Sequence, residues 1–229
     1  MATNLSAEFS RYDQKLEFIL RTSAQIFADK SYHATSMRDI SRATGVSLAG
    51  LYHYCKSKDE LLFLIQDNCF GRVLQRLEQR LSTEPDPGQK LRIFIDNHLA
   101  FFAANMAEMK VLSHEADSLA GELQNHVSAK KQKYTKRARK ILSDLKRETK
   151  ETSVDVTVAT YALFGMMNWI YNWYDPNGKL NVEQLVDNVT RLFLQGFLGG
   201  LATRPPNFAS EAVTESLSVW RLVHSDDSN

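Results

Sequence analysis

The sequence of 229 residues has little cysteine, glycine or proline, with two, ten and five residues respectively. Two cysteines, Cys55 and Cys69, exclude a disulfide scaffold and suit a reducing compartment. The low glycine and proline content excludes collagen-like and low-complexity chains. The longest strongly apolar stretch, residues 161–171, is interrupted by Asn168 and is too short to cross a bilayer. The first residues show no signal-peptide pattern, so we expect a cytoplasmic protein.

An excess of one charge sign is absent as well. The chain has 28 basic and 27 acidic residues, so a nucleic-acid function would need a local basic patch. The composition is 43% hydrophobic and 24% charged, as in ordinary globular proteins, and good helix formers are plentiful. The composition therefore favours an all-α fold.

Helical periodicity recurs along the whole chain, without convincing strand alternation. The apolar spacing predicts helices over residues 11–30, 36–44, 48–54, 57–81, from 87 onward, 117–147, 154–174 and 182–201, with a short one near 213–222. A break is expected at residues 109–113. Ser57 with Glu60, and Asn181 with Gln184, have the spacing of capping boxes. Asp86 precedes a proline at the first helical position, so it is expected to cap the helix that follows.

Residues 35–58 have the pattern of a helix-turn-helix unit, because two short helices flank a turn that contains Gly45. Gly45 can adopt the left-handed conformation that this turn needs. Such a unit places its second helix in the major groove of DNA. A small apolar set is expected to fix the angle between the helices: Ile40, Ala43, Val46 and Leu51. The early residues of the second helix are small enough to approach base edges: Ser47, Leu48, Ala49 and Gly50. Three further residues are expected to face phosphates: Tyr52, His53 and Lys58.

Two stretches resemble the tetracycline-repressor (TetR) family of transcriptional regulators. They are residues 27–36 (Phe-Ala-Asp-Lys-Ser-Tyr-His-Ala-Thr-Ser) and residues 45–61 (Gly-Val-Ser-Leu-Ala-Gly-Leu-Tyr-His-Tyr-Cys-Lys-Ser-Lys-Asp-Glu-Leu). Ser31 replaces the family's usual glycine, which predicts a different, less strained helix end. Cys55 replaces the usual Phe, which predicts weaker packing or compensation by a neighbour. Gly50 replaces a residue that is often hydroxylated, which removes one possible DNA contact.

The resemblance implies three segments: a helix-turn-helix DNA-binding domain (1–60), a helical ligand-binding and dimerisation domain (61–203) and a C-terminal tail (204–229). It implies a repressor that binds a palindromic operator as a homodimer and is released by a small molecule. The expected DNA-binding residues are Ser36, Arg38, Ser47, Leu48, Ala49, Gly50, Tyr52, His53 and Lys58. Residues 1–60 hold only eight basic against seven acidic side chains. The affinity would therefore depend on basic residues placed locally on phosphates, and a plain helical hairpin is the alternative.

Residues 164–180, with Trp169, Trp173 and Tyr174, resemble TetR regulators of fatty-acid or steroid-side-chain degradation that respond to acyl-CoA thioesters. These aromatic residues would otherwise only close a dimer bundle, and a stripe of Phe and Met is often simple core. The expected effector-binding residues are Phe94, His98, Phe102, Met106, Tyr134, Phe164, Met167, Trp169 and Trp173. Residues 130–150 hold ten basic and two acidic side chains. They form either a solvated face or a phosphate-binding rim for the CoA nucleotide.

The helix from residue 182 carries a broad apolar face, and the resemblance implies that the last two long helices pair with those of a second copy. The expected interface residues are Trp173, Leu185, Val189, Leu192, Phe193, Gly196 and Phe197. The alternative is that this face packs inside one subunit.

Three functions compete for this sequence. The leading hypothesis is a repressor released by an acyl-CoA, and the second is a multidrug-sensing repressor with an aromatic pocket. Acidic residues in the pocket would favour the drug sensor, and basic residues at its mouth would favour acyl-CoA. A helical enzyme or lipid carrier is the third. Neither a metal site nor a cofactor is expected, because no ligand spacing, phosphate loop or nucleophile motif is recognisable.

Overall fold

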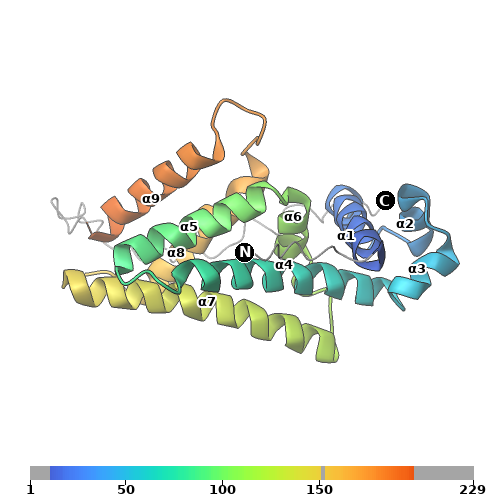
Figure 1. The fold of residues 1–229 in the computed structure, drawn as a ribbon, viewed down its shortest axis with the longest axis horizontal. Coiled ribbons are helices and arrows are strands. Elements are labelled where there is room, and N and C mark those ends of the chain that lie inside the picture. The colour runs from blue at the N-terminus through green and yellow to red at the C-terminus, as the bar shows by residue number, and fades with distance from the viewer. Residues whose placement is uncertain (1–10, 151–152, 199–229) are drawn as a thin grey trace, which may run out of the picture.

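The computed structural model describes residues 11–150 and 153–198, and all regular structure in these ranges is helical (Figure 1). The all-α fold is therefore confirmed for the described residues, and the helix expected near 213–222 lies outside them. The helices are α1 (Arg11–Lys30), α2 (Met37–Thr44), α3 (Leu48–Tyr54), α4 (Lys58–Leu81), α5 (Pro87–Ala103), α6 (Met106–His114), α7 (Gly121–Thr149), α8 (Val156–Asn168) and α9 (Val182–Leu198), with a 3₁₀ turn η1 (Trp169–Asn172) after α8.

The helices α1, α2 and α3 form a head at one end of the molecule (Figure 1). At the start of α2, Ser36 Oγ accepts a bond from Asp39 N at 3.2 Å, and the Asp39 carboxylate accepts one from Ser36 N at 2.9 Å. Gly45 ends α2 with φ 64°, in the left-handed region that the turn requires. Ser47 Oγ then accepts from Gly50 N at 3.0 Å at the start of α3. The predicted helix-turn-helix is confirmed, with a cap at each helix start.

The packing of the helix-turn-helix differs in one residue from the expectation. Ile40 and Leu51 are fully buried and Val46 is half-buried, but Ala43 is exposed. Thr44 is buried instead, and its Oγ1 donates to the Ile40 carbonyl at 2.8 Å. The hydroxyl can be buried without loss because the helix backbone satisfies it.

The end of α1 does not have the relaxed conformation expected for Ser31. Ser31 has φ 69°, which is the left-handed conformation that a glycine would adopt there. Its carbonyl accepts a bond from Thr35 Oγ1 at 2.8 Å, which helps to hold the turn. The expectation of a less strained end is wrong, because the direction in which the chain enters α2 dictates this backbone shape whatever the side chain. A non-glycine residue in this region costs about 1–2 kcal/mol.

The remaining helices form a second body around α4 and α5. The helix α4 runs out of the head along the molecule, with α7 packed on one side, while α9 packs on α5 at the opposite side (Figure 1). On α7 the predicted inner stripe is buried as expected: Val127, Tyr134, Ala138, Ile141 and Leu145. The ligand-domain core is therefore built from the α4, α5, α7, α8 and α9 faces that point at one another.

Several helix ends differ from the sequence prediction. The break expected at residues 109–113 is wrong, because α6 runs through it from Met106 to His114. The breaks lie on either side, at residues 104–105 and 115–120, and α7 begins only at Gly121. Likewise α8 stops at Asn168, and the chain tightens into η1. No proline or glycine lies at residues 104–105 or 115–120, so apolar spacing alone misplaces these ends.

The predicted caps are present in most of their details. Asp86 accepts from Gln89 N at 2.6 Å, and Asn181 and Gln184 exchange bonds of 2.9 and 3.1 Å. Ser57 Oγ accepts from Glu60 N at 3.0 Å, but the Glu60 carboxylate accepts from Lys56 N rather than from Ser57. Half of the capping box expected at Ser57 is therefore displaced by one residue.

The head and the ligand domain share part of one core. The core of the head includes Leu61, Leu62 and Ile65 from α4, and also Val111 of α6 and Val127 of α7. The helix α6 packs along α1, so the first helix of the head rests on the ligand domain. The helix α6 and the head therefore share one packed interface.

Candidate DNA-binding surface, effector cavity and dimer face

The second helix of the helix-turn-helix presents its expected contact residues to the outside. Tyr52 is 48% exposed, and His53, Ser47 and Ala49 are exposed too. Leu48 and Gly50 are half-buried, whereas Ser36 and Arg38 at the start of α2 are exposed. A Cβ added to Gly50 would lie 2.9 Å from Val46 Cγ1 and 3.1 Å from Ser47 Oγ. Gly50 therefore lets the turn pack tightly, which gives its presence a structural reason.

Lys58 does not project freely towards a ligand, as the sequence suggested. Its ammonium donates to the carbonyls of Tyr32 and Thr35, both at 2.9 Å, and lies 4.3 Å from the centroid of the Tyr32 ring. The Tyr32 hydroxyl in turn donates to Asp59. The lysine ties the loop after α1 to the start of α4, so in this structure it is part of the framework of the head.

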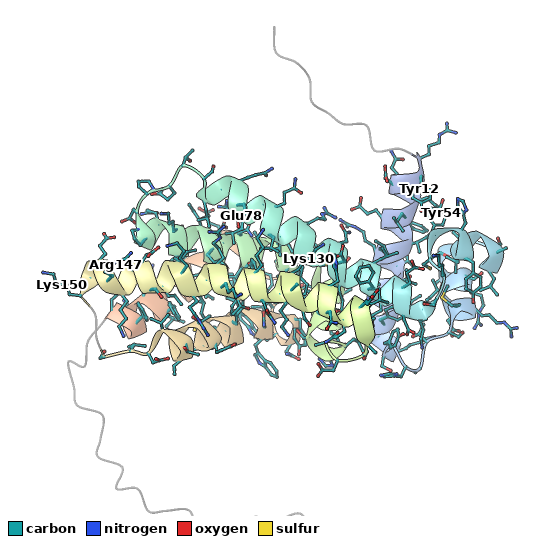
Figure 2. The ribbon with its side chains drawn as sticks, turned by 90° about the horizontal axis from the view of Figure 1, so that it is seen from below. Tyr12, Tyr54, Glu78, Lys130, Arg147 and Lys150 are labelled. Carbon is teal, nitrogen blue, oxygen red and sulfur yellow. The ribbon has the colours of Figure 1, made fainter. Side chains whose placement is uncertain are left out.

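An aromatic group at the outer edge of the head was missed by the sequence reasoning. Tyr12 stacks on Tyr54 with ring centroids 4.8 Å apart, and its edge meets His53 at 6.0 Å. The two tyrosines lie side by side where α1 meets the end of α3 (Figure 2). The contact braces α3, and it joins residues 42 positions apart in the sequence (12 and 54), which no local pattern reveals.

A cavity of about 440 Å³ lies between α5, α6, α7 and α8. Five of the expected effector residues line it: His98, Phe102, Tyr134, Phe164 and Trp169. Tyr161, from the apolar stretch 161–171, and Lys131, from the basic segment 130–150, line it as well. The lining residues that sequence reasoning missed are Phe70, Met109, Leu112, Ser113, Ala116, Thr135, Gly165, Asn168 and Tyr171. Four of these come from α6 and the residues after it, whose position only the tertiary structure reveals. The volume is within the range of small-molecule sites.

Four expected effector residues do not line this cavity. Phe94 lies behind it, stacked on Tyr134 at 5.0 Å, and Met167 is fully buried in the core. Met106 is half-buried at the start of α6, and Trp173 is exposed beyond η1. These positions correct the prediction, which could not tell the inner layer of an aromatic cluster from its surface.

The polar groups of the cavity are few and well defined. His98 is only 2% exposed, and its Nδ1 lies 3.2 Å from the Tyr134 hydroxyl. Burial lowers the pKa of His98 to about 3, so the imidazole is neutral near pH 7. Lys131 is the one charged side chain among the described residues that line the cavity, and none of these residues is acidic. The lining is therefore aromatic and apolar with one positive charge.

The apolar residues of α9 divide between the core and the surface. Leu185, Val189, Phe193 and Phe197 are buried within the subunit, where α9 packs on α5. This corrects their assignment to the dimer interface, since a partner subunit cannot reach side chains already covered by α5. Leu192 is 65% exposed, and Gly196 is exposed beside it on the helix.

A second exposed apolar stripe follows α8 and the turn after it. Val158, Tyr161, Trp169 and Trp173 are 64, 60, 60 and 53% exposed. Val158, Tyr161 and Trp169 share one side with Gly165, because they are spaced three or four residues apart. Contiguous apolar patches of this kind mark interaction sites. The name α8/α9 face is used below for the exposed residues Val158, Tyr161, Gly165, Trp169 and Trp173 together with Leu192 and Gly196 of α9.

The basic residues of α7 are partly neutralised within the subunit. Arg137 forms bonds with both oxygens of Glu78, and Lys130 Nζ lies 2.5 Å from Asp67 Oδ1. Asp144 similarly pairs with Lys140 and Arg147. In the described structure, the side chains of Lys131, Lys133, Lys136 and Arg139 make no such bond. The unpaired basic side chains are therefore spread along α7, and of these four only Lys131 lines the cavity.

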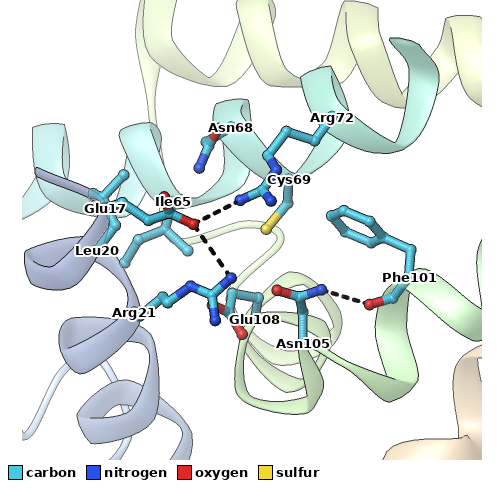
Figure 3. Close-up of a pocket in the computed structure, with 10 residues that line it drawn as sticks. All are labelled: Glu17, Leu20, Arg21, Ile65, Asn68, Cys69, Arg72, Phe101, Asn105 and Glu108. Atoms are coloured by element: carbon cyan, nitrogen blue, oxygen red, sulfur yellow. Dashed lines mark hydrogen bonds and ion pairs between the residues drawn. The ribbon is translucent and has the colours of Figure 1, made fainter. Parts of the chain in front are cut away.

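Two polar clusters connect the head with the ligand domain. In the first, Glu17 of α1 bonds with Arg21 at 3.2 Å and with Arg72 of α4 at 3.1 Å (Figure 3). Glu108 of α6 lies beside them, and burial raises its pKa above the ordinary value. The cavity there is only about 10 Å³, so it has no room for an effector. This cluster joins α1, α4 and α6.

In the second cluster, the buried Glu115 follows α6 directly. Its Oε1 accepts from Tyr32 N at 3.2 Å, and its Oε2 accepts from Ser118 Oγ at 2.6 Å. Gln66 of α4 donates to the Glu115 carbonyl at 2.9 Å. The end of α6 is therefore bonded to the same loop of the head that Lys58 holds.

Metal-binding groups and membrane-spanning helices were sought among the described residues. None of their His, Cys, Asp or Glu side chains form a group of three that could hold a metal ion. Among the helices of these ranges, not one is long and apolar enough to cross a membrane.

An exposed helix-turn-helix joined to a helical body that contains an open cavity defines a DNA-binding regulator with room for a small molecule. Comparison with known families agrees with this class. Residues 19–65 match the bacterial regulatory proteins of the tetR family, and residues 84–197 match the tetracyclin repressor-like C-terminal domain. The chain belongs to the TetR family of transcriptional regulators.

Three known proteins resemble the chain over most of its length. The HTH-type transcriptional repressor KstR2 of Mycolicibacterium smegmatis is 27% identical, over 80% of this chain and 88% of its own. The fatty acid metabolism regulator protein of Bacillus subtilis is 24% identical, over 78% of this chain and 93% of its own. The crystal structure of AibR in complex with isovaleryl coenzyme A and operator DNA has a TM-score of 0.70 and 29% identity, over 78% of this chain and 97% of that one.

Proposed function

We propose that this protein is a repressor that binds a palindromic operator as a homodimer and is released by an acyl-CoA thioester. The exposed face of α3, with Tyr52 and His53 beyond the small residues Ser47 and Ala49, supports DNA binding. A recognition helix presents its N-terminal residues to base edges and its flanks to phosphates. The head therefore acts as the DNA-binding domain, and the protein carries out regulation rather than catalysis.

Dimerisation is assigned to the α8/α9 face. A dimer matches two half-sites one DNA turn apart, about 34–36 Å, with its two recognition helices. Leu192 and Trp169 are large apolar side chains left open to water, and the glycines at 165 and 196 have nothing within 4 Å of an added Cβ. Helices without side chains at those points can approach a partner closely. Tyr161 and Trp169 also line the cavity, so the partner would lie near its mouth.

The chemistry of the cavity supports an acyl-CoA effector. An apolar, aromatic lining suits an acyl chain, which gains about 0.8 kcal/mol for each buried methylene. Lys131, which is exposed on α7, supplies a positive charge to the lining, which suits a phosphate of CoA. A cationic drug would lack a counter-charge, because none of the described lining residues is acidic. The likeness to AibR, whose structure holds isovaleryl coenzyme A and operator DNA, agrees with this assignment.

The release of DNA is assigned to α6. Met109, Leu112 and Ser113 of α6 line the cavity, and the same helix packs along α1 and ends at Glu115. An effector that favours another position of α6 must therefore move the loop at Tyr32 that leads into α2. A ligand shifts such an equilibrium only by its difference in affinity for the two positions.

A DNA mobility-shift titration tests this function. The operator is taken from the region upstream of the protein's own gene, and CoA, free fatty acids and acyl-CoAs of several chain lengths are added to the complex. We expect acyl-CoAs to release the DNA, with a steep dependence on chain length until the cavity is full. Lys131→Gln should weaken the response, whereas the control Lys133→Gln, on the other side of α7, should not. Release by hydrophobic cations instead of acyl-CoAs would favour the multidrug sensor.

A further inference from the structure

The buried side chain of His98 has one polar atom that the protein leaves unsatisfied. Its Nδ1 is 3.2 Å from the Tyr134 hydroxyl, whereas Nε2 is fully buried and has no partner within hydrogen-bonding geometry among the described residues. The Asn168 side chain, which lines the same cavity, is close enough to act on the pKa of His98. His98 itself lines the effector cavity. Buried polar groups are nearly always hydrogen-bonded, and an unsatisfied one costs about 1–3 kcal/mol. Such an atom at the wall of a cavity points to a group of the ligand.

The surroundings of His98 determine what this group can be. Its neighbours are aromatic, with Phe102, Tyr134 and Phe164 at ring distances of 4.7, 5.9 and 5.9 Å. An anion at Nε2 would gain no counter-charge from His98, because burial lowers the pKa of the imidazole and keeps it neutral near pH 7, and Lys131 is exposed on α7 rather than packed among these rings. The partner of Nε2 is therefore an uncharged oxygen, not a carboxylate.

The direction of the hydrogen bond between Nδ1 and Tyr134 determines which kind of ligand oxygen can pair with Nε2. When the Tyr134 hydroxyl donates to Nδ1, Nε2 carries the proton and donates to a carbonyl oxygen of the ligand. When Nδ1 donates to Tyr134, Nε2 accepts from a hydroxyl of the ligand. Tyr134 therefore orients the imidazole, and the direction of its hydrogen bond with Nδ1 decides which tautomer His98 adopts.

We propose that His98 is a specificity-determining residue of the effector cavity, which hydrogen-bonds through Nε2 to an uncharged oxygen of the acyl group. This inference rests on the proposed acyl-CoA effector and specifies which part of that effector His98 recognises. The oxygen is either the thioester carbonyl or a keto or hydroxyl oxygen further along the chain. Lys131 and Tyr134 both line the cavity and are one helical turn apart on α7.

Calorimetric titration of the full-length protein with matched ligands tests the proposal. The ligands are hexanoyl-CoA, the thioether S-hexyl-CoA, which lacks the carbonyl, and hexanoyl-CoAs with a keto or hydroxyl oxygen at carbon 3 or 5. Hexanoyl-CoA is compared with S-hexyl-CoA, and each keto or hydroxy compound is compared with hexanoyl-CoA. In one of these pairs we expect the ligand with the additional oxygen to bind the wild type about 5- to 100-fold more tightly than the ligand without it. The same ratio should fall towards one in His98→Leu. It should be unchanged in His126→Leu, the same substitution at an exposed histidine of α7 that does not line the cavity.

The two sources of the oxygen give different results. A preference for hexanoyl-CoA over the thioether identifies the thioester carbonyl, and a preference for an oxygenated chain identifies the chain oxygen. If His98→Leu does not fold, Tyr134→Phe replaces it, because it keeps the ring but removes the hydroxyl that orients His98, and the ratio should fall. Equal affinities in every pair, or ratios that persist in the variants, would overturn the proposal while the acyl-CoA effector stands. If no CoA compound binds, the proposed effector fails as well.

Discussion

Replacing Lys58 by Met distinguishes a framework residue from a DNA contact. The variant keeps the length of the side chain but loses two bonds to carbonyls at 2.9 Å and the contact with the Tyr32 ring. Bonds with a charged partner contribute about 1.5–3 kcal/mol each, and an exposed cation–π contact about 0.5–1 kcal/mol. Lys58 is half-buried, so water competes for its ammonium and the sum must be reduced. We expect a loss of about 2–3 kcal/mol in the free energy of unfolding.

Urea unfolding at a fixed protomer concentration measures this loss, as a midpoint lowered by roughly 1 M with an unchanged slope. The control is Lys56→Met, whose exposed side chain makes no bond within the described structure, and which should unfold like the wild type. Operator affinity is measured over a range of salt at a temperature where the variant is folded. If Lys58 contacts a phosphate, the variant should have a salt slope smaller by about one than the wild type. If Lys58 is a framework residue, the two slopes should be equal. A stable variant with a reduced slope would refute the reasoning.

Four further variants test the other parts of the account. Tyr52→Ala should weaken operator binding by about fivefold or more without loss of stability, because the side chain is exposed in the subunit. Leu192→Asp should give folded monomers in sedimentation, since the charge would be buried only in the dimer, at a cost of several kcal/mol. Glu115→Gln, which weakens the bond to Tyr32, should reduce the factor by which the effector lowers DNA affinity. His98→Leu should flatten the pH dependence of stability. The pKa of His98 is lowered to about 3 in the native protein, so below about pH 6.5 the unfolded chain binds a proton that the native chain does not. The wild type therefore loses up to about 1.4 kcal/mol per pH unit as the pH falls from there.

Each of these variants has an outcome that the account does not allow. Normal operator binding by Tyr52→Ala would remove α3 as the reading helix, and dimeric Leu192→Asp would remove the α8/α9 face as the interface. An undiminished effector response in Glu115→Gln would leave α6 without a role in release. Parallel stability curves for the wild type and His98→Leu between pH 6 and 4 would mean that His98 is not buried as a neutral group.

The head could be predicted from the sequence because its determinants are local. Gly45 needs its left-handed turn, and Ser47 caps the next helix from three residues away, so short-range spacing suffices to find them. Ser31 shows the limit of this reasoning, because the fold imposes a left-handed conformation that the side chain disfavours. Lys58 shows another limit, since its partners lie 23 and 26 residues away in the chain.

The ligand domain was harder to predict in detail, because an apolar face does not reveal which neighbour covers it. Phe193 and Leu192 are adjacent on α9, yet one packs on α5 and the other faces outward. The cavity wall likewise depends on α6, whose residues Met109 and Leu112 reach the cavity only through the packing of four helices. The pattern could predict an apolar interior, but not where that interior is left empty.

Thermodynamic linkage offers the most direct test of the central claim, that one acyl-CoA site controls DNA binding. The measurement is the dissociation constant of an acyl-CoA for the free dimer and for the dimer saturated with operator DNA. The account predicts weaker binding to the DNA complex, by the same factor by which the acyl-CoA lowers DNA affinity, about 5- to 150-fold for a typical coupling. Equal dissociation constants for the free and the DNA-bound protein would contradict it.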